Sequence, residues 1–140
     1  MTETLPRGCE LVELRVIGDE RGSLVAIEAG REAPFDIARA YYLIETRADV
    51  VRGLHAHKTL RQLAVAVSGA CTMILDDGRR REEIRLERPS QGLLMGPMVW
   101  REIRDFSADC VLLVLADSAY DERDYIRDYE VFRRALEATA

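Results

Sequence analysis

The chain contains two histidines, and they lie one residue apart in the segment Arg52-Gly53-Leu54-His55-Ala56-His57. On an extended strand, side chains two residues apart point to the same face, so the two imidazoles are expected to lie side by side. Imidazole exchanges protons near neutral pH, and a nearby guanidinium can stabilise a developing oxyanion or hold a phosphate. We therefore interpret His55 and His57 as a proton-transfer or metal-binding pair rather than as two core histidines.

The strand expected after the histidines has small residues on one side. Alternation divides its residues into two faces, with Leu63, Val65 and Val67 on one and Gln62, Ala64, Ala66 and Ser68 on the other. A barrel that encloses a ligand needs small inward-facing residues, whereas a filled barrel needs bulky ones. If the Gln62 face points inward, the pattern predicts a ligand pocket beside the histidines.

Short runs of β-branched, aliphatic and aromatic residues alternate with turn signals along most of the chain. They predict strands over residues 11–17, 23–28, 37–45, 55–57 continuing through 63–67, 71–75, 83–86 and 110–116. Many short strands without internal repeats are typical of a sandwich or barrel. Between Asp121 and Leu136, helical spacing of apolar residues predicts a helix that closes one end of the barrel or contacts another subunit; the apolar positions are Tyr125, Tyr129, Phe132 and Leu136.

Composition excludes several classes of function. A net charge of −5 argues against general binding to nucleic acid, which depends on clustered cations. No stretch approaches the roughly 20 apolar residues of a membrane span, and the first residues lack the pattern of a signal peptide, so a cytoplasmic protein is expected. The three cysteines show no paired spacing, and buried packing of Cys71 and Cys110 is expected rather than disulfides. The chain has no phosphate-binding or dinucleotide-binding glycine motif.

The spacing of Gly53, His55, His57, Gln62 and Gly69 resembles the first motif of the cupin barrels. A metal-binding cupin has Glu where this chain has Gln62, and it carries a third histidine on a later strand. In the corresponding segment here, residues 97–101, the residue expected near a metal is Arg101, which is no metal ligand and would repel a divalent cation. We therefore expect no metal, although Glu102 and Asp105 are carboxylates that could approach from the same segment.

Further motifs follow one another along the chain: Asp19-Glu20-Arg21-Gly22-Ser23-Leu24, Tyr41-Tyr42, the histidine segment, Leu75-Asp76-Asp77-Gly78, Gly96-Pro97-Met98-Val99-Trp100, Asp105-Phe106-Ser107 and residues 120–127. In order and spacing they resemble one family, the dTDP-4-keto-6-deoxyglucose 3,4-ketoisomerases, which are metal-free cupins. The resemblance implies an all-β cupin jelly-roll barrel with a C-terminal helix, a single domain over residues 1–140, and no cofactor. It also implies a homodimer in which N-terminal strands can be exchanged between subunits.

The resemblance implies a reaction on a dTDP-4-keto-6-deoxy sugar. A base removes the C3 proton, which the 4-ketone makes acidic, and reprotonation of the enediolate at C4 leaves the ketone at C3. By resemblance His55 and His57 are base and shuttle in either order, and Arg52 and Arg21 hold the diphosphate or sugar oxygens. The remaining substrate-binding residues expected are Gln62, Arg101 and whichever of Tyr41 and Tyr42 faces the pocket.

Some alternatives remain open at the level of sequence. Arg101 resembles the branch of the family with gluco products and Arg21 the branch with galacto products, so the configuration at C4 is undetermined. A 3,5-epimerase acting on the same substrate would use a similar base. A non-catalytic cupin that binds sugar nucleotides would need the same pocket, and a metal-dependent cupin oxygenase would need bound metal.

Overall fold

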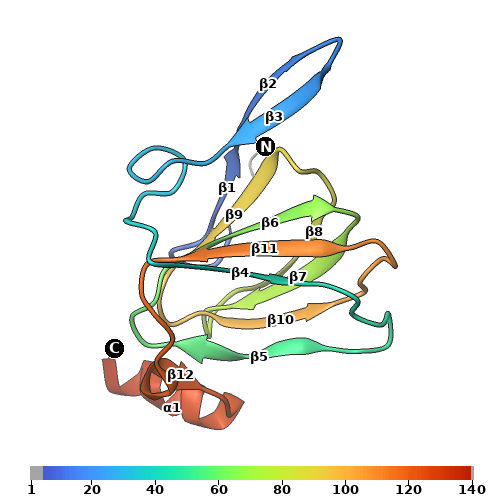
Figure 1. Ribbon diagram of the computed structural model, residues 1–140. Helices are drawn as coiled ribbons and strands as arrows, with labels where there is room; N and C mark the ends of the chain where they lie inside the picture. Colours follow the sequence, from blue (N-terminus) through green and yellow to red (C-terminus); the bar gives the residue numbers. More distant parts are fainter. Residues whose placement is uncertain (1–4, 140) are drawn as a thin grey trace.

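Two five-stranded antiparallel sheets face each other and form a jelly-roll barrel in the computed structural model, which describes residues 5–139 (Figure 1). This confirms the all-β cupin fold with a C-terminal helix. The first sheet has, in spatial order, β1 (Glu10–Glu13), β9 (Gln91–Met95), β6 (Gln62–Ser68), β11 (Val111–Ala116) and β4 (Arg39–Leu43). The second has β12 (Tyr125–Ile126), β5 (Arg52–His57), β10 (Trp100–Arg104), β7 (Cys71–Asp76) and β8 (Arg81–Leu86).

The space between the sheets is filled by apolar side chains over most of its length. Ala64 and Ala66 point into it, which confirms that the Gln62 face of β6 is the inner face. Large side chains pack against these two alanines, so the predicted hollow beside them is wrong and only the Gln62 end of the strand adjoins polar groups. The packed residues include Met73, Leu75, Leu93, Met95, Leu112 and Val114. Cys71 and Cys110 are buried free thiols in the same cluster, as expected.

A second apolar cluster covers the outer face of the first sheet. Leu63 and Val65 of β6 point outward there and are covered by Leu14 and Phe35 from the N-terminal quarter of the chain. Burial of both faces of β6 over residues 62–66 explains why the residues that follow Gln62 there are all apolar. It also makes β6 a rigid support for Gln62 at its first position.

The segment predicted as one strand over residues 11–17 is two strands. Leu14 is buried and its N–H bonds to the carbonyl of Ser90, so pairing of β1 with β9 ends there. The chain then enters a separate hairpin of β2 (Arg15–Asp19) and β3 (Gly22–Ala26) that projects away from the barrel (Figure 1). Alternation within the segment could not reveal this change of partner.

The predicted helix over Asp121 to Leu136 is wrong in its first half. Helix α1 spans Tyr129–Thr139, and the preceding residues form a short 3-10 helix (Glu122–Asp124) followed by β12. Asp128 accepts a bond from the N–H of Val131 at the start of α1, which favours initiation at that point. The helix lies against the outside of the second sheet (Figure 1), where Phe132 packs on Trp100. Tyr125 therefore belongs to a strand and is free to face the barrel.

The histidine segment and the run that follows it are separate strands. β5 lies in the second sheet and β6 in the first, because residues 58–61 carry the chain across the barrel mouth. Strands β9, β10 and β12 were not predicted as strands. The turn that joins β7 to β8 begins in the Asp76-Asp77-Gly78 segment. Among the described residues, no helix is long and apolar enough to cross a membrane.

Candidate active site

A distorted turn at the start of β5 sets the direction of His55. Gly53 and Leu54 both have positive φ, at 81° and 56°, and the pairing of β5 with β10 shifts register at this point. A side chain on Gly53 would come within 3.0 Å of the Arg101 carbonyl oxygen, so glycine is needed for space as well as for φ. The His55 Nδ1 atom lies 2.9 Å from the Gly53 carbonyl, and His55 is directly opposite Arg101 across the strands.

His57 is fully buried and is held from the neighbouring segment. Its Nδ1 atom lies 2.9 Å from Asp124 Oδ2, and its strand partner in β12 is Tyr125. The ring centroids of His55 and His57 are 4.8 Å apart, and the Tyr125 ring lies 4.9 Å from the first and 4.4 Å from the second. The two imidazoles therefore share one face, as the spacing predicted, and a tyrosine closes the group.

The hydrogen-bond partners determine the tautomer of each neutral imidazole. A carbonyl or carboxylate oxygen only accepts, so both Nδ1 atoms must carry the proton and both Nε2 atoms have a free lone pair. Nε2 of His57 is buried and has no partner. Burial and then the charge of Arg101 lower the pKa of His55 to about 4 and that of His57 to about 3, so both rings are neutral at pH 7.

Arg101 is a buried cation without a carboxylate partner. Its guanidinium donates to Gln62 Oε1 and to the Val99 carbonyl at 3.0 Å, and its Nε atom has no partner. None of the ion pairs formed by the described residues involves it. A buried charge with only neutral partners is unfavourable, and burial lowers its pKa. The arrangement favours a negative charge in the space that Arg101 shares with the histidines.

Gln62 connects this arginine to Tyr41. The Gln62 amide nitrogen donates to the Tyr41 hydroxyl at 2.9 Å while its carbonyl accepts from Arg101. Tyr41 lies opposite Val114 and faces the interior, whereas Tyr42 lies on the outer face and is mainly exposed. The strand register thus shows that Tyr41 rather than Tyr42 faces the interior, a choice that alternation along the sequence left open.

Two of the expected substrate-binding arginines lie away from this group. Arg52 is exposed at the start of β5 and precedes the distorted turn. Arg21 lies at the tip of the projecting hairpin, where its side chain is 85% exposed and paired with Asp19. Within one chain, the structure brings together His55, His57, Tyr41, Gln62 and Arg101 but not Arg21, Arg52 or Tyr42.

Sequence reasoning missed three residues of the group, namely Tyr125, Asp124 and Arg39. The guanidinium carbon of Arg39 lies 5.1 Å from the ring centroid of Tyr41 and 5.7 Å from that of Tyr120. Tyr125 and Asp124 lie in the motif over residues 120–127, but assignment of that segment to a helix concealed their direction. The only usable signal was the density of acidic and aromatic residues in this motif.

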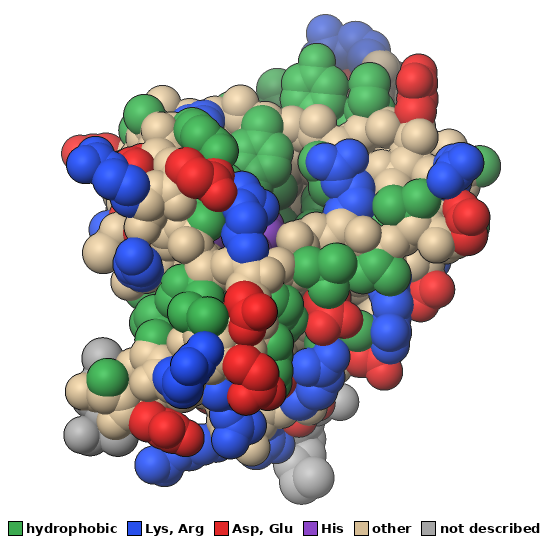
Figure 2. All heavy atoms as spheres, turned by 90° about the horizontal axis from the view of Figure 1, so that it is seen from below, with side chains coloured by type: hydrophobic (Ala, Val, Ile, Leu, Met, Phe, Trp, Pro, Cys, Tyr) green, Lys and Arg blue, Asp and Glu red, His purple; other side chains and the backbone are tan. Residues whose placement is uncertain are grey.

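A cavity of about 410 Å³ opens beside His57. Arg39, Tyr120, Tyr125, Thr59 and Asp124 are among the other residues that line it. In the space-filling view of Figure 2, histidine is visible only at the bottom of a hollow, beside an Arg or Lys side chain. His57 is thus adjacent to a cavity with charged and aromatic side chains in its lining.

The donor set of this site does not suit a metal ion. Among residues 5–139, the structure groups no three His, Cys, Asp or Glu side chains in a metal-binding arrangement. Glu102 points outward to Trp100 and Arg81 rather than to the histidines. The side chains present can instead accept and return a proton and stabilise negative charge.

A jelly-roll barrel that carries a histidine pair on one strand, with Gln62 and a buried arginine nearby, defines the protein as a cupin. The chain belongs to the FdtA family, described as WxcM-like, C-terminal, whose model matches residues 7–137. A TDP-4-oxo-6-deoxy-alpha-D-glucose-3,4-oxoisomerase from Aneurinibacillus thermoaerophilus is 50% identical over 127 residues, which cover 91% of each chain.

Two solved structures show the same fold and related sequences. The TDP-quinovose 3,4-ketoisomerase WlaRB from Campylobacter jejuni is 47% identical, with a TM-score of 0.89, and the match covers 91% of this chain and 98% of that one. The sugar 3,4-ketoisomerase QdtA from Thermoanaerobacterium thermosaccharolyticum, in complex with TDP, is 39% identical, with a TM-score of 0.93. That match covers 96% of this chain and 98% of QdtA.

Proposed function

We propose that this protein is a sugar-nucleotide 3,4-ketoisomerase that converts dTDP-4-keto-6-deoxy-D-glucose to a dTDP-3-keto-6-deoxyhexose. The observation that carries the proposal is the pair of neutral imidazoles with free Nε2 atoms beside a buried arginine that lacks a counter-ion. Relatives over nearly the whole chain are 3,4-ketoisomerases, and a TDP-sugar is accordingly the proposed substrate.

The proposed reaction needs only proton transfers. The Nε2 atom of one histidine removes the C3 proton, and the electron pair passes into an enediolate whose negative oxygen is stabilised by Arg101. A proton is then added at C4, O4 gains a proton and O3 loses one, so the ketone moves from C4 to C3. Since both imidazoles are neutral at pH 7, either can act as base. One takes the C3 proton at its Nε2 atom and passes it to O4, and the other takes the O3 proton at its Nε2 atom and passes it to C4.

The remaining predicted residues are proposed to hold the substrate. Tyr41 and Gln62 hydrogen-bond to each other beside Arg101 and offer polar groups to the sugar. Arg52, exposed and without an ion pair among the described residues, is proposed to hold the diphosphate. Tyr42 faces away from the histidines, and a role for it in binding substrate has no support within one chain.

We further propose a homodimer in which the β2–β3 hairpin docks on the partner subunit. The hairpin carries exposed Val16, Ile17 and Leu24, at 53%, 59% and 58% exposure. Such a projecting apolar hairpin is unfavourable in water unless another surface covers it. Docking on a partner would also place Arg21, at the tip of the hairpin, against the second chain. There Arg21 could contact the substrate bound to that chain.

The reaction is tested by NMR of purified protein with dTDP-4-keto-6-deoxyglucose in deuterated water. A 3-keto product with deuterium at C4 is expected, and a parallel reaction in H2O gives the C4 configuration. Deuterium at C5 would indicate 3,5-epimerisation instead. Tight binding without proton exchange would indicate a non-catalytic sugar-nucleotide-binding protein.

The histidine assignment has its own test. His55→Asn and His57→Asn combined should reduce turnover by at least about 100-fold, because no other imidazole is present to move the proton. Binding of TDP by isothermal titration should persist in this variant. Turnover at the wild-type rate would contradict the acid–base role.

A further inference from the structure

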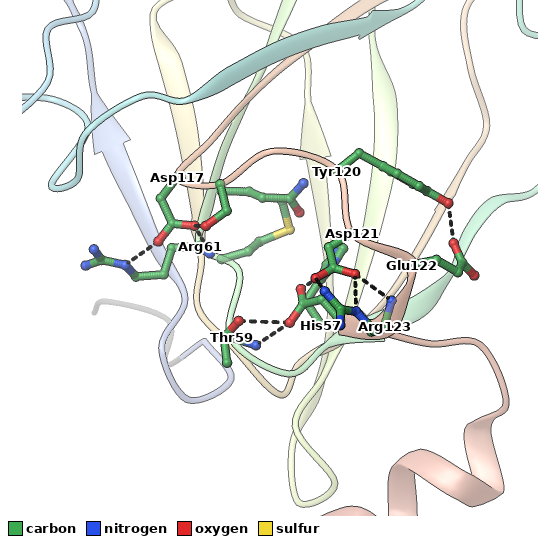
Figure 3. A network of polar contacts seen from close by, with 12 residues as sticks. His57, Thr59, Arg61, Asp117, Tyr120, Asp121, Glu122 and Arg123 are labelled. Atoms are coloured by element: carbon green, nitrogen blue, oxygen red, sulfur yellow. Dashed lines mark hydrogen bonds and ion pairs between the residues drawn. The ribbon is translucent and has the colours of Figure 1, made fainter.

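Asp124 joins the segment before β12 to the end of β5 through both of its carboxylate oxygens. Oδ1 accepts two hydrogen bonds from Thr59, one from the backbone N–H at 2.8 Å and one from the hydroxyl at 2.9 Å, drawn as dashed lines in Figure 3. Oδ2 lies 2.9 Å from Nδ1 of His57. The Asp124 carbonyl also accepts from the N–H of Lys58 at 2.9 Å.

These contacts leave the carboxylate little freedom to rotate. With Oδ1 held by two donors, Oδ2 is the oxygen directed at His57. Partial burial raises the pKa of the carboxyl, but hydrogen bonds from Thr59 and His57 outweigh this effect and lower the pKa, so the carboxylate remains ionised. The side chain of Asp124 is 14% exposed, so water replaces these donors only in part. An ionised acceptor at Nδ1 holds the imidazole in one tautomer.

The tautomer of His57 matters because it leaves the second ring nitrogen, Nε2, without a proton. The N–H of Met98 holds the backbone of His57 by donating to its carbonyl at 2.7 Å, while the bond to Asp124 and complete burial hold the ring. Nε2 is then unprotonated, buried and, among the described residues, without a hydrogen-bond partner, and His57 is one of the residues that line the cavity. A proton on Nε2 instead would remove the lone pair that accepts a proton from the substrate.

We propose that Thr59 is a positioning residue that holds Asp124, and through it His57, in the orientation and tautomer needed for proton transfer. Among the described residues, Thr59 makes no hydrogen bond to either histidine, and its hydroxyl donates to Oδ1 of Asp124. The inference rests on the proposed function for its kinetic consequence. The tautomer of His57 can be measured independently of any activity.

The experiment combines kinetics with NMR of the histidine ring nitrogens. Thr59→Val removes the hydroxyl but keeps the side-chain shape and the backbone donor, Thr59→Ser restores the hydroxyl, and Thr59→Ala serves if valine impairs folding. Asp124→Asn provides the reference for complete loss of the ionised acceptor. Thr72→Val is the matched control, because Thr72 is a buried threonine whose hydroxyl accepts from Arg85, away from the histidines.

Thr59→Val is expected to lower kcat by about tenfold, the effect of losing one charge-assisted hydrogen bond that solvent partly replaces, with KM changed by less than about twofold. The ¹⁵N spectrum of His57 should change from one Nδ1–H tautomer to a mixture, and Thr59→Ser should restore both properties. Thr72→Val should leave both unchanged.

Two results would overturn the proposal. One is a wild-type kcat and an unchanged His57 spectrum in Thr59→Val and Thr59→Ala. The other is a lower kcat with an unchanged His57 spectrum and no rescue by serine, which would assign Thr59 a merely structural role. If the wild-type protein has no ketoisomerase activity, the proposed function fails, and the spectra alone decide whether Thr59 controls the tautomer.

Discussion

The two imidazoles are kept neutral by the same burial that makes their Nε2 atoms available. Desolvation and the charge of Arg101 oppose protonation, and the hydrogen bonds that the rings donate to Gly53 and Asp124 only partly offset these effects. A base that stays unprotonated at pH 7 is ready to accept a proton from carbon. Keeping the histidines neutral lowers the free energy of unfolding at acid pH, because histidines bind protons in the unfolded chain that they do not bind in the folded protein.

The free energy of unfolding is therefore expected to fall as the pH decreases from 7.5 to 5.5. Between the unfolded pKa of about 6.5 and the folded values of about 4 and about 3, the unfolded state binds more protons, so stability is lost as pH falls through this window. For two histidines the loss amounts to about 3 kcal/mol at pH 5.5. Urea titrations at fixed protein concentration measure it.

The double variant His55→Asn/His57→Asn is a complete control, since it removes every histidine in the chain. Its unfolding free energy should be nearly constant over the same range. Carboxylates with lowered pKa, such as Glu32 at about 2, lose their contribution only at lower pH. A wild-type protein that is equally stable at pH 7.5 and 5.5 would contradict neutral buried histidines.

Helix α1 supports the outside of the strand that carries the histidines. Phe132 is fully buried against Ala56, Trp100 and Ile126, the last of which lies in β12 beside Tyr125. Ala56 is the residue between the two histidines, so one face of β5 contacts the helix and the other bears the imidazoles. The helix thereby fixes β5 and β12 from behind.

Phe132→Ala is expected to lower the free energy of unfolding by about 3–5 kcal/mol, because it leaves a cavity in a closed apolar cluster. Urea unfolding followed by circular dichroism measures this change. Val131→Ala is the control on the same helix, as Val131 is 45% exposed and should change stability by less than about 0.5 kcal/mol. Equal effects of the two substitutions would show that the helix does not depend on this contact.

The β2–β3 hairpin exposes apolar side chains that its own chain leaves uncovered. Its exposed apolar side chains contrast with the buried outer face of the first sheet, which Leu14 and Phe35 cover. A hairpin of two strands is marginally stable alone in water. Both facts support its docking on a second copy of the chain.

Ile17→Asp combined with Leu24→Asp is expected to convert the dimer to a monomer, because charges on an apolar docking surface must be desolvated. Light scattering coupled to gel filtration measures the mass. Val131→Asp places the same charge on an exposed valine of α1 and should leave the dimer intact. A wild-type monomer, or a dimer that survives the hairpin substitutions, would contradict the proposed assembly.

Much of the candidate site could be predicted from local pattern. The shared face of His55 and His57 follows from strand geometry. Gln62 occupies the position where a metal-binding cupin has a carboxylate, and this residue type argued against a metal site. Gly53 was part of the cupin motif in the sequence. Its role in directing His55 could be inferred only from the structure, where Gly53 lies close to the Arg101 carbonyl. Tyr125 was placed on a helix, because its spacing to Tyr129 suits a helix and a two-residue strand leaves almost no periodic signal.

Residue types and spacing thus predicted a sandwich or barrel and the shared face of the two imidazoles, and the resemblance of the motifs to one family predicted the cupin jelly roll. The acid–base role of the imidazoles stays a prediction. Contacts between distant segments were not predictable in this way. The carboxylate that orients His57 lies 67 residues away, and Gln62 and Arg101 are 39 residues apart. Such partners depend on the register between strands and on the path of loops, which are set by packing of the whole barrel rather than by local preference.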